Sequence, residues 1–332
     1  MLSSTTLLAI LSALALTSVQ AAPADKNSLD YLANKAGKRY LGTAVQSPQL
    51  VPGSQYVQIL ESQFDAITPE NEMKWEVVEP TEGNFDFTGT DKIVAEAKKT
   101  GSLLRGHNIC WDSQLRYAHE VAPKMKLCIN DYNIETVNAK SQAMAKVAAG
   151  LLAKGAPLHC IGMFKNAKRR SSGLLIRTAS SGLESHFIGG STPKDIPAAM
   201  NLFSDQGLEV PMTELDVRIP VNGNDMPANA TVAKEQVDDY YTSVSACLGN
   251  DLCPGVSIWQ FADPTSWIPG VFKGKLIAVS CTFSGCLLQY CVGYGAALLY
   301  DAQYQPKSTY YVVQQALKDG KNSGSKFHGI KL

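Results

Sequence analysis

The sequence predicts an α/β protein folded as a (β/α)8 TIM barrel, and two observations support this fold. Short apolar runs alternate with longer amphipathic stretches, which is the pattern of strand–helix units around a parallel sheet. Polar and aromatic residues follow the end of almost every apolar run, and barrel enzymes build their sites on that face. An open nucleotide-binding sheet fits less well, because no Gly-rich phosphate loop follows any of these runs.

The expected elements follow directly from these patterns. The expected strands are the apolar runs, at Tyr40–Val45, Ala66–Thr68, Leu103–Trp111, Lys126–Tyr132, Leu158–Gly162, Val210–Val217 and Gly255–Phe261. The expected helices are the amphipathic stretches, at Asp91–Lys99, Thr136–Ala153, Pro193–Gln206 and Ala233–Leu248. Residues 22–332 suit a single barrel domain, since a barrel commonly has about this length.

Composition excludes several classes of partner. The chain of 332 residues has 30 Lys and Arg against 30 Asp and Glu, so nothing steers it to nucleic acid or to an anionic membrane. A neutral polysaccharide is a compatible partner, and 45% hydrophobic residues are enough for a sizeable core. No metal-ligand spacing or cofactor motif is present, so we expect a monomer that needs no metal and no cofactor.

The N-terminus predicts export from the cell. The apolar run Leu7–Leu16 precedes a small-residue exit with Val19-x-Ala21, so residues 1–21 are predicted to be a signal peptide. A membrane anchor is the alternative, but the run is too short to span a bilayer. Eight cysteines suit an oxidising compartment, and Asn229 begins a possible glycosylation sequon.

Glu214 is the first candidate for chemistry. The tetrapeptide Thr213–Asp216 directly follows the apolar residues Val210–Met212. A carboxylate at the end of a buried strand is costly unless it has partners, so Glu214 is a candidate nucleophile or acid. The alternative is a structural carboxylate that caps a helix or pairs with Arg218.

Aromatic and polar residues near other strand ends suit a sugar ligand. The flat faces of Trp111, Trp259 and Trp267 suit sugar rings, although core packing is the commoner role of a single Trp. Thr68–Trp75 collects donors and acceptors for sugar hydroxyls, with a solvated turn as the alternative. His107 and His186 could orient a carboxylate, but a lone buried His is more often structural. The sequence therefore predicts a cleft of aromatic and hydrogen-bonding groups.

Six segments in order resemble the signatures of the family 10 glycoside hydrolases, the secreted fungal-type endo-1,4-β-xylanases. The segments carrying this resemblance are Thr68–Trp75, Leu104–His107 with Trp111 and Ser113–Leu115, Ile129–Asn133, Glu184–Phe187, Thr213–Asp216, and Trp259–Trp267 with Pro269–Phe272. The resemblance spans about residues 30 to 317. It implies a TIM barrel that hydrolyses β-1,4-xylosidic linkages in xylan, and a disulfide between Cys247 and Cys253.

The resemblance also implies roles for individual residues. Such enzymes retain configuration and use two carboxylates about 5 Å apart, one as nucleophile and one as acid/base. Glu214 matches the nucleophile, and His186 matches the histidine that hydrogen-bonds it. The residues that match those holding the non-reducing sugar are Glu70, Asn71 and Lys74. The residues that match those around the cleaved sugar are His107, Trp111, Gln114, Trp259 and Trp267.

The chain lacks one segment of the family pattern. The family carries a Trp-Asp-Val-Val-Asn-Glu-like segment after its third strand, and the Glu of that segment is the acid/base. This chain passes from Ser113–Leu115 straight to Tyr117–Val121, which resembles the helix before the fifth strand. Roughly fifty to seventy residues, including the whole fourth strand, are thus missing. Asp112 also stands where the family usually has His.

Two insertions interrupt the same pattern. Met163–Gly182 splits the expected sixth strand, and Lys275–Gly293 falls in a loop. Each insertion follows a Gly directly and ends at a Gly, as an intron that splits a Gly codon would leave. The first has five basic residues and no acidic one, which suits a buried strand poorly. We favour translated introns and a skipped exon over genuine divergence.

These departures set the expectations for the chain as written. Without its fourth strand the barrel has seven strands, so we expect it to be incomplete, and either distorted or open. Without an acid/base residue we expect little or no xylanase activity, because the leaving sugar would have to depart as an alkoxide. A non-catalytic xylan-binding protein is the second hypothesis, and a hydrolase of another β-linked glucan or glycoside is a third.

Overall fold

The computed structural model describes most of the chain. The described residues are 25–107, 114–131, 133–162, 185–222, 225–273, 276–282, 285–290 and 293–322. The predicted signal peptide, Trp111, Asp112 and the insertion Met163–Gly182 lie outside these ranges.

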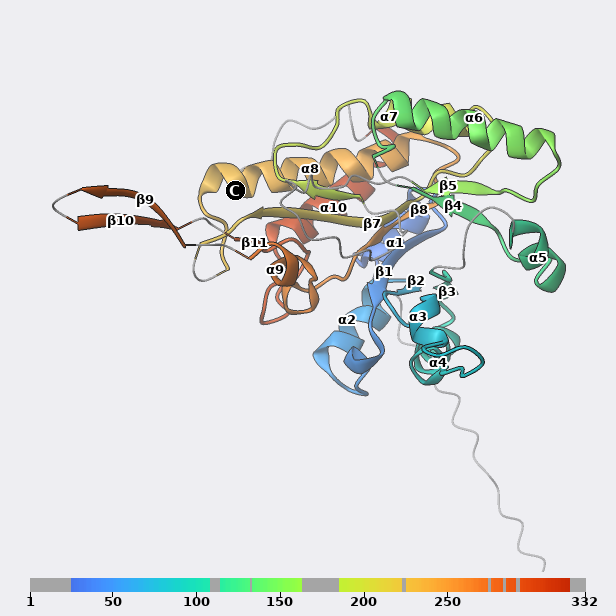
Figure 1. Ribbon diagram of the computed structural model, residues 1–332, viewed down its shortest axis with the longest axis horizontal. Helices are drawn as coiled ribbons and strands as arrows, with labels where there is room; N and C mark the ends of the chain where they lie inside the picture. The colour runs from blue at the N-terminus through green and yellow to red at the C-terminus, as the bar shows by residue number, and fades with distance from the viewer. Residues whose placement is uncertain are drawn as a thin grey trace, which may run out of the picture.

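Parallel strands form an arc that follows the order of a barrel (Figure 1). The strands of the arc are β1 (Tyr40–Val45), β2 (Ala66–Pro69), β3 (Leu103–Leu104), β4 (Cys128–Asn130), β5 (Cys160–Gly162), β6 (His186–Ile188), β7 (Met212–Pro220) and β8 (Gly255–Ile258). The first strand pairs in parallel with both β2 and β8, so the two ends of the chain meet as a barrel requires. The strand β7 pairs in parallel with β6 and β8.

Among the described residues the ring is open between β3 and β4. Of the described strands, β3 pairs with β2 and β4 pairs with β5, and these two edges do not pair with each other. Leu103 and Leu104 are 52% and 39% exposed, as expected for strand residues that lack a covering neighbour. The prediction of an incomplete barrel is confirmed for the described residues, and the open edges lie where the missing fourth strand of the family is expected to run.

The short strands β5 and β6 are two halves of one barrel strand. Cys160 in β5 lies opposite Glu209, and His186 in β6 lies opposite Asp216 on the same partner strand. Seven residues separate the two positions on the partner, whereas 26 separate them on the split strand, of which 20 belong to Met163–Gly182. Without the insertion, six positions separate Cys160 from His186, one fewer than the seven on the partner strand. The partner has one extra residue at the irregularity of β7 between Met212 and Leu215, which accounts for the difference. The described register therefore fits a single strand interrupted by an insertion.

Amphipathic helices cover the outside of the arc (Figure 1). The helices are α1 (Leu29–Lys35), α2 (Gln55–Gln63), α3 (Trp75–Val78), α4 (Thr88–Thr100), α5 (Gln114–Val121), α6 (Ala139–Ala153), α7 (Ile196–Ser204), α8 (Ala230–Gly249), α9 (Ile268–Val271) and α10 (Ser308–Asp319), with 3₁₀ turns at Ser47–Gln49, Asp263–Thr265 and Gly320–Asn322. All four expected helices are present, with ends within three residues of the prediction. In the described part of the chain, no helix is long and apolar enough to cross a membrane.

Side-chain caps decide where two of the long helices begin. The side chain of Asn138 accepts from the backbone N–H of Ser141, whose hydroxyl accepts from the Asn138 N–H in return. Asn229 caps α8 by accepting from the Val232 N–H at 3.0 Å. The α8 helix therefore starts three residues before the expected position, and the exposed Asn of the sequon is its cap.

The core lies between the strands and the helices. Apolar residues of the arc such as Leu41, Ile67 and Ile258 are fully buried. They belong to one cluster with Val244 of α8 and Ala316 of α10. Burial of about 25 cal/mol per Å² of apolar surface makes this layer the main stabilising contribution, even with the ring open.

The second insertion forms an antiparallel hairpin of β9 (Leu276–Thr282) and β10 (Gly285–Tyr290). The hairpin projects away from the rest of the molecule, at the left of Figure 1, and its register sets Cys281 opposite Cys286. The next strand, β11 (Tyr294–Gly295), returns the chain to the body by pairing antiparallel with the end of β7. The insertion therefore extends a loop without entering the arc, as the sequence predicts.

Two disulfides are present in the described residues. Cys247–Cys253, implied by the resemblance, joins the end of α8 to the residues before β8, with a Cα–Cα distance of 5.3 Å. Cys128–Cys160 was not predicted, and it links β4 to β5 at paired positions with a Cα–Cα distance of 4.5 Å. The sequence feature that could have indicated this disulfide is the presence of one Cys in each of two consecutive expected strands. This second bond fixes the strand at one of the two open edges.

Deleting Met163–Gly182 should stabilise the protein by making β5 and β6 continuous. Closing a twenty-residue loop costs roughly 2–3 kcal/mol by chain entropy, so the midpoint of thermal unfolding should rise by at least about 4 °C. Deleting Lys275–Gly293 is the matched control, because that hairpin lies outside the arc, and a smaller change is expected. A deletion variant that unfolds at a lower temperature than the parent would contradict the split-strand interpretation.

Replacing Cys128 with Ser should destabilise the protein more than replacing Cys247 with Ser. The bond that Cys128 forms spans 32 residues and the bond of Cys247 spans six. Chain entropy then predicts losses of about 4 and about 2 kcal/mol respectively. Denaturant unfolding of the two variants measures both losses of stability. Equal losses would show that the bond beside the open edge contributes no more than the bond of Cys247.

Candidate active site

The candidate polar residues gather at the carboxyl ends of the parallel strands. Glu70 follows β2, His107 follows β3, Glu214 lies in β7 and Trp259 follows β8. All four are buried. Because parallel strands of a barrel end at the same face, residues far apart in sequence meet there.

Alternate residues of β7 place three charged side chains on one face of the strand. Glu214, Asp216 and Arg218 are 1%, 0% and 1% exposed. The same strand, β7, pairs with β6 at Asp216–Arg218 and with β8 at Met212 and Leu215. Buried charges need partners, so this face requires groups from neighbouring strands.

His107 lies beside the Glu214 carboxylate. Its Nδ1 lies 3.7 Å from Glu214 Oε1. Burial, with further contributions from Arg105 and Lys74, holds the pKa of His107 well below its usual range. The imidazole is therefore neutral near pH 7, and it contacts the carboxylate without forming an ion pair. Burial also lowers the pKa of Arg105, and the negative charge of Glu214 opposes this shift.

His186 is held by Asp216, which lies opposite it in the β6–β7 register. His186 Nδ1 is 2.6 Å from Asp216 Oδ2, and Trp267 Nε1 donates to the same oxygen at 2.9 Å. The carboxylate thus fixes one ring nitrogen of the histidine and the indole of the tryptophan. The predicted bond from His186 to Glu214, two residues earlier on the strand, stays a prediction.

A second carboxyl group lies in a network of amides. Glu70 Oε2 accepts from Gln260 Nε2 at 2.6 Å and from Gln46 Nε2 at 3.0 Å. Burial raises the pKa of Glu70, while the two amide donors act in the opposite direction. Gln260 in turn accepts from the Tyr56 hydroxyl at 3.0 Å. This network fixes Glu70 as a hydrogen-bonding group on the floor of the site.

Asn71 and Lys74, predicted with Glu70 to hold a sugar, lie together. Lys74 Nζ donates to Asn71 Oδ1 at 2.7 Å. The two side chains follow β2 in the turn that leads into α3, which starts at Trp75. The structure therefore brings together the three residues of this predicted group.

Tryptophan rings cover the two histidines. The Trp259 ring lies edge-on to His107 at 5.3 Å and to His186 at 6.4 Å between centroids. The half-buried Trp267 ring lies 4.6 Å from His186. Aromatic surface beside a carboxylate and neutral hydrogen-bonding groups suits an uncharged polyhydroxyl ligand such as a sugar chain.

Two predicted site residues cannot be placed. Trp111 lies outside the described residues, and Gln114 is the first residue of α5, whose side chain at that position is not described. The structure also places three residues in the site that were not singled out from the sequence, namely Gln46, Gln260 and Asp216. Gln260 carried a signal, since it is a polar residue inside an expected apolar strand, and it adopts a positive φ of 67°.

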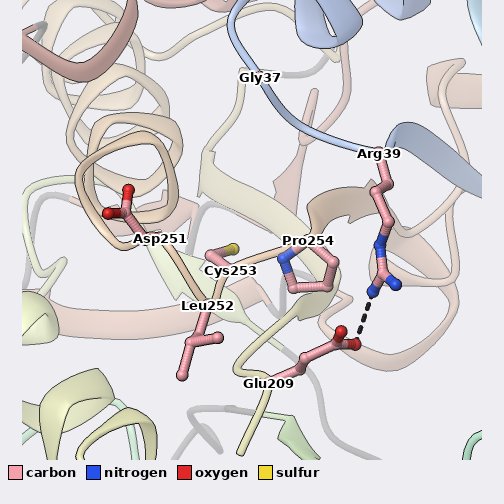
Figure 2. A pocket seen from close by; sticks show the side chains of 7 residues that line it. All are labelled: Gly37, Arg39, Glu209, Asp251, Leu252, Cys253 and Pro254. Carbon is pink, nitrogen blue, oxygen red and sulfur yellow. Dashed lines mark hydrogen bonds and ion pairs between the residues drawn. The ribbon is translucent and has the colours of Figure 1, made fainter. Parts of the chain in front are cut away.

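A pocket of about 190 Å³ lies at the opposite end of the strands (Figure 2). Its lining includes Arg39 before β1, Glu209 before β7 and Pro254 before β8. Arg39 and Lys126 both pair with Glu209 at 2.5 Å. The amino ends of barrel strands support stability, and the pocket is smaller than the usual 300 Å³ or more of a ligand site, so we assign it no catalytic role. The described residues contain no cluster of acidic, His or Cys side chains that could hold a metal ion.

The fold and the site together indicate the class of protein to which the chain belongs. A parallel α/β barrel that carries a buried carboxylate, histidines and aromatic rings at the carboxyl face is the arrangement of a barrel glycoside hydrolase. The sequence profile described as glycosyl hydrolase family 10 matches residues 28–117 and 114–316, so the chain belongs to this family. The match divides at residues 114–117, where the segment with the fourth strand is missing.

Curated relatives agree with this family. The chain is 29% identical to endo-1,4-beta-xylanase A of Phanerodontia chrysosporium, with 74% of this chain and 71% of the relative covered. It is 28% identical to an endo-1,4-beta-xylanase of Agaricus bisporus, with 74% and 87% covered. With endo-1,4-beta-xylanase 2 of Aureobasidium pullulans it is 27% identical over 393 aligned positions, covering 95% of this chain and 99% of the relative. That alignment is longer than this chain of 332 residues, so it leaves gaps here.

Solved structures share the fold. Penicillium canescens endo-1,4-beta-xylanase XylE superposes with a TM-score of 0.68 at 25% identity, covering 88% of this chain and 97% of that one. Xylanase 10B from Thermotoga petrophila RKU-1, in complex with xylobiose, gives a TM-score of 0.71 at 24% identity, covering 88% and 97%. The predicted TIM barrel fold is thus confirmed for the family, and the described residues of this chain form it as an open ring.

Replacing His107 with Gln should make stability less sensitive to mild acid. The unfolded chain binds a proton to His107 as pH falls through about 6.5, whereas the folded protein keeps this ring neutral, so acid favours unfolding. The loss of stability between pH 6.5 and 5.5 should be about 1 kcal/mol smaller in the variant. Glu70 acts in the opposite direction at lower pH, because burial raises its pKa and the folded state then holds its proton more tightly.

The control for this measurement is His119→Gln, in the half-buried part of α5. Urea unfolding of parent and variants at both pH values gives the comparison. If His107→Gln and the parent lost equal stability over this interval, the buried neutral state of His107 would be wrong.

Proposed function

We propose that this chain binds β-1,4-linked xylan at the carboxyl ends of its strands and that Glu214 is the nucleophile of a retaining glycoside hydrolase. The observation that carries the proposal is the burial of Glu214 beside His107, whose ring lies edge-on to Trp259. The names of the xylanase relatives support xylan as the substrate. The neutral composition of the chain suits an uncharged polysaccharide.

In the proposed first step, a Glu214 oxygen attacks the anomeric carbon of a bound xylose unit. The bond from that carbon to the leaving oxygen breaks, and its electron pair goes to the leaving group. Glu70, Asn71 and Lys74 would hold the sugar on the non-reducing side with the hydrogen-bonding groups described above. Trp259 and Trp267 would lie beside the xylose unit that reacts, and His107 would contact Glu214 as a neutral imidazole.

We propose that the natural reaction is impaired because the acid/base residue is missing. The described carboxylates near the strand ends already have other partners: Glu70 is bound by two amides, Asp131 pairs with Lys140 at 2.6 Å, and Asp216 binds His186. Loss of a positioned acid typically costs about a hundred- to ten-thousand-fold in rate. A leaving group that departs without taking up a proton does not need the acid, so its reaction rate should not be lowered in this way.

We further infer that the protein is exported and acts alone as a monomer outside the cell. The pattern of residues 1–21 and the two disulfides, Cys128–Cys160 and Cys247–Cys253, support an oxidising compartment. The exposed position of Asn229 is compatible with a glycan at the predicted sequon.

A 2,4-dinitrophenyl 2-deoxy-2-fluoro-β-xylobioside should label Glu214 in stoichiometric amount. Dinitrophenolate leaves without protonation, so the missing acid is not needed, and the fluorine slows release of the sugar from the enzyme. We expect one equivalent of dinitrophenolate and a peptide carrying the fluoroxylobiosyl group on Glu214, measured by absorbance and mass spectrometry. Turnover of birchwood xylan by the same preparation should be at or near background.

The matched control is Glu214→Gln, which should release no dinitrophenolate while it still binds xylohexaose. A label on another carboxylate would overturn the assignment of the nucleophile. Binding of xylohexaose with no labelling of the parent protein would favour the alternative, a non-catalytic xylan-binding protein. Rapid hydrolysis of xylan that Glu214→Gln abolishes would show that another residue supplies the acid.

A further inference from the structure

Gln260 joins two parts of the candidate site. It directly follows Trp259, just after β8 ends, and its side chain reaches the carboxylate of Glu70. The residue is fully buried, with 0% of its surface exposed. A buried amide is costly unless both its oxygen and its nitrogen have hydrogen-bond partners, so the contacts of this side chain constrain the groups around it.

The backbone of Gln260 is held in the left-handed region by bonds on both sides. Its φ of 67° is strained for a residue other than Gly, and such strain persists only where the surrounding structure enforces it. Before it, the Trp259 N–H donates to the Leu215 carbonyl of β7 at 2.9 Å. After it, the Phe261 carbonyl accepts from the Tyr300 N–H at 2.9 Å. The fold therefore fixes the position from which the Gln260 side chain starts.

Contacts at both ends determine which way the Gln260 amide points. The hydroxyl of Tyr56, on α2, donates to Gln260 Oε1 at 3.0 Å, and Gln260 Nε2 donates to Glu70 Oε2 at 2.6 Å. A carboxylate can only accept, whereas a hydroxyl can donate, so this orientation of the amide satisfies all three groups. Tyr56 therefore acts on Glu70 through Gln260.

The two oxygens of Glu70 differ in their partners. Oε2 accepts from Gln260 and also from Gln46 Nε2, at 3.0 Å. No described residue donates a hydrogen bond to Oε1. With both amides bound to one oxygen, the other remains an acceptor for a donor from a ligand, and a sugar hydroxyl is such a donor.

We propose that Gln260 is a positioning residue: its amide, oriented by Tyr56, holds Glu70 Oε2 so that Oε1 is presented to a hydroxyl of the sugar on the non-reducing side. The link from Tyr56 through Gln260 to Glu70 concerns the folded protein alone. The step from Glu70 to the sugar rests on the proposed function.

The titration of Glu70 gives a measure of this link. Burial raises the pKa of Glu70, and the hydrogen bond from Gln260 opposes this rise. Loss of the Gln260 donor should therefore raise the pKa further, because the ionised form loses a bond that the protonated form needs less. The other charged or titratable side chains that act on Glu70 or on the Tyr56 hydroxyl are Glu72, Lys74 and Tyr304.

The first test follows the side-chain carboxyl signal of Glu70 in protein labelled with ¹³C-glutamate, and Glu70→Gln assigns the signal by its loss. In Gln260→Met, which fills the space without a donor, the midpoint of the titration should rise by about one pH unit. Gln46→Met is the matched control, since it removes the longer bond to the same oxygen, and a smaller rise is expected.

Tyr56→Phe shows whether the amide carries the effect. It should raise the midpoint in the parent, where it frees the amide to turn, and should add nothing in Gln260→Met. An unchanged midpoint in Gln260→Met would refute the proposal, and so would an equal effect of Tyr56→Phe in both backgrounds. If Gln260→Met does not give folded protein, Gln260→Gly replaces it, since Gly accepts a φ of 67° without strain.

The second test measures xylohexaose binding by calorimetry between pH 4.5 and 7.5. Gln260→Met should bind about tenfold more weakly than the parent at the acid end and approach it near neutrality. A uniform loss at all pH values would indicate a packing defect, and parent-like binding throughout would show that the sugar does not use the oxygen held in this way; either result would overturn the proposal. If the parent protein does not bind xylohexaose, the proposed function fails, and the carboxyl signal still decides the link from Gln260 to Glu70.

Discussion

The pairing of β7 with parallel strands on both sides is the constraint on which the rest of the structure depends. The face of β7 that carries Glu214, Asp216 and Arg218 is buried, and burial makes each charge costly unless a neighbour compensates for it. These neighbours come from different parts of the chain, so the site can form only when the strands adopt the order of the barrel. The extra residue in β7 then adjusts its register to both neighbours.

Loss of one strand affects the two sides of the ring unequally. From β5 and β6 through β7, β8 and β1 to β2, each strand is bound to the next by described backbone pairing. This side carries the nucleophile candidate, the amide network around Glu70 and two of the tryptophans. The side between β3 and β4 is open, and there the family places its acid/base. In the proposed reaction, binding and the first covalent step would use the paired side, whereas proton transfer would use the open one.

Two insertions of similar length have different physical consequences. Met163–Gly182 interrupts a strand between two paired neighbours, so it separates β5 from β6 and costs chain entropy. Lys275–Gly293 enters a turn outside the arc, and its strands β9 and β10 pair with each other and not with the strands of the arc. Position in the sheet, and not length or composition alone, decides what an insertion does to a barrel.

The local patterns of the sequence predicted the helices α4, α6, α7 and α8, because apolar periodicity is a local property. The motifs around Glu214, Glu70 and Trp259 likewise indicated the family and most of the site. Contacts between strands that are distant in sequence were harder to predict from the sequence. The Cys128–Cys160 disulfide, the amides of Gln46 and Gln260 around Glu70, and the contact of Arg218 with Phe272 appear only when the register is known. Helix ends were also shifted, since caps such as Asn229 override the apolar pattern.

The sequence by itself determined which residues could carry chemistry, that a strand of the family barrel is missing, and where two segments interrupt the pattern. Each of these follows from the order and type of residues along the chain. Only the tertiary structure decided that the ring opens between β3 and β4, that β5 and β6 continue one strand, and that His186 faces Asp216. The physical reason is that pairing register and burial of charge depend on strands that are distant in sequence, and a chain of residue types does not specify their alignment.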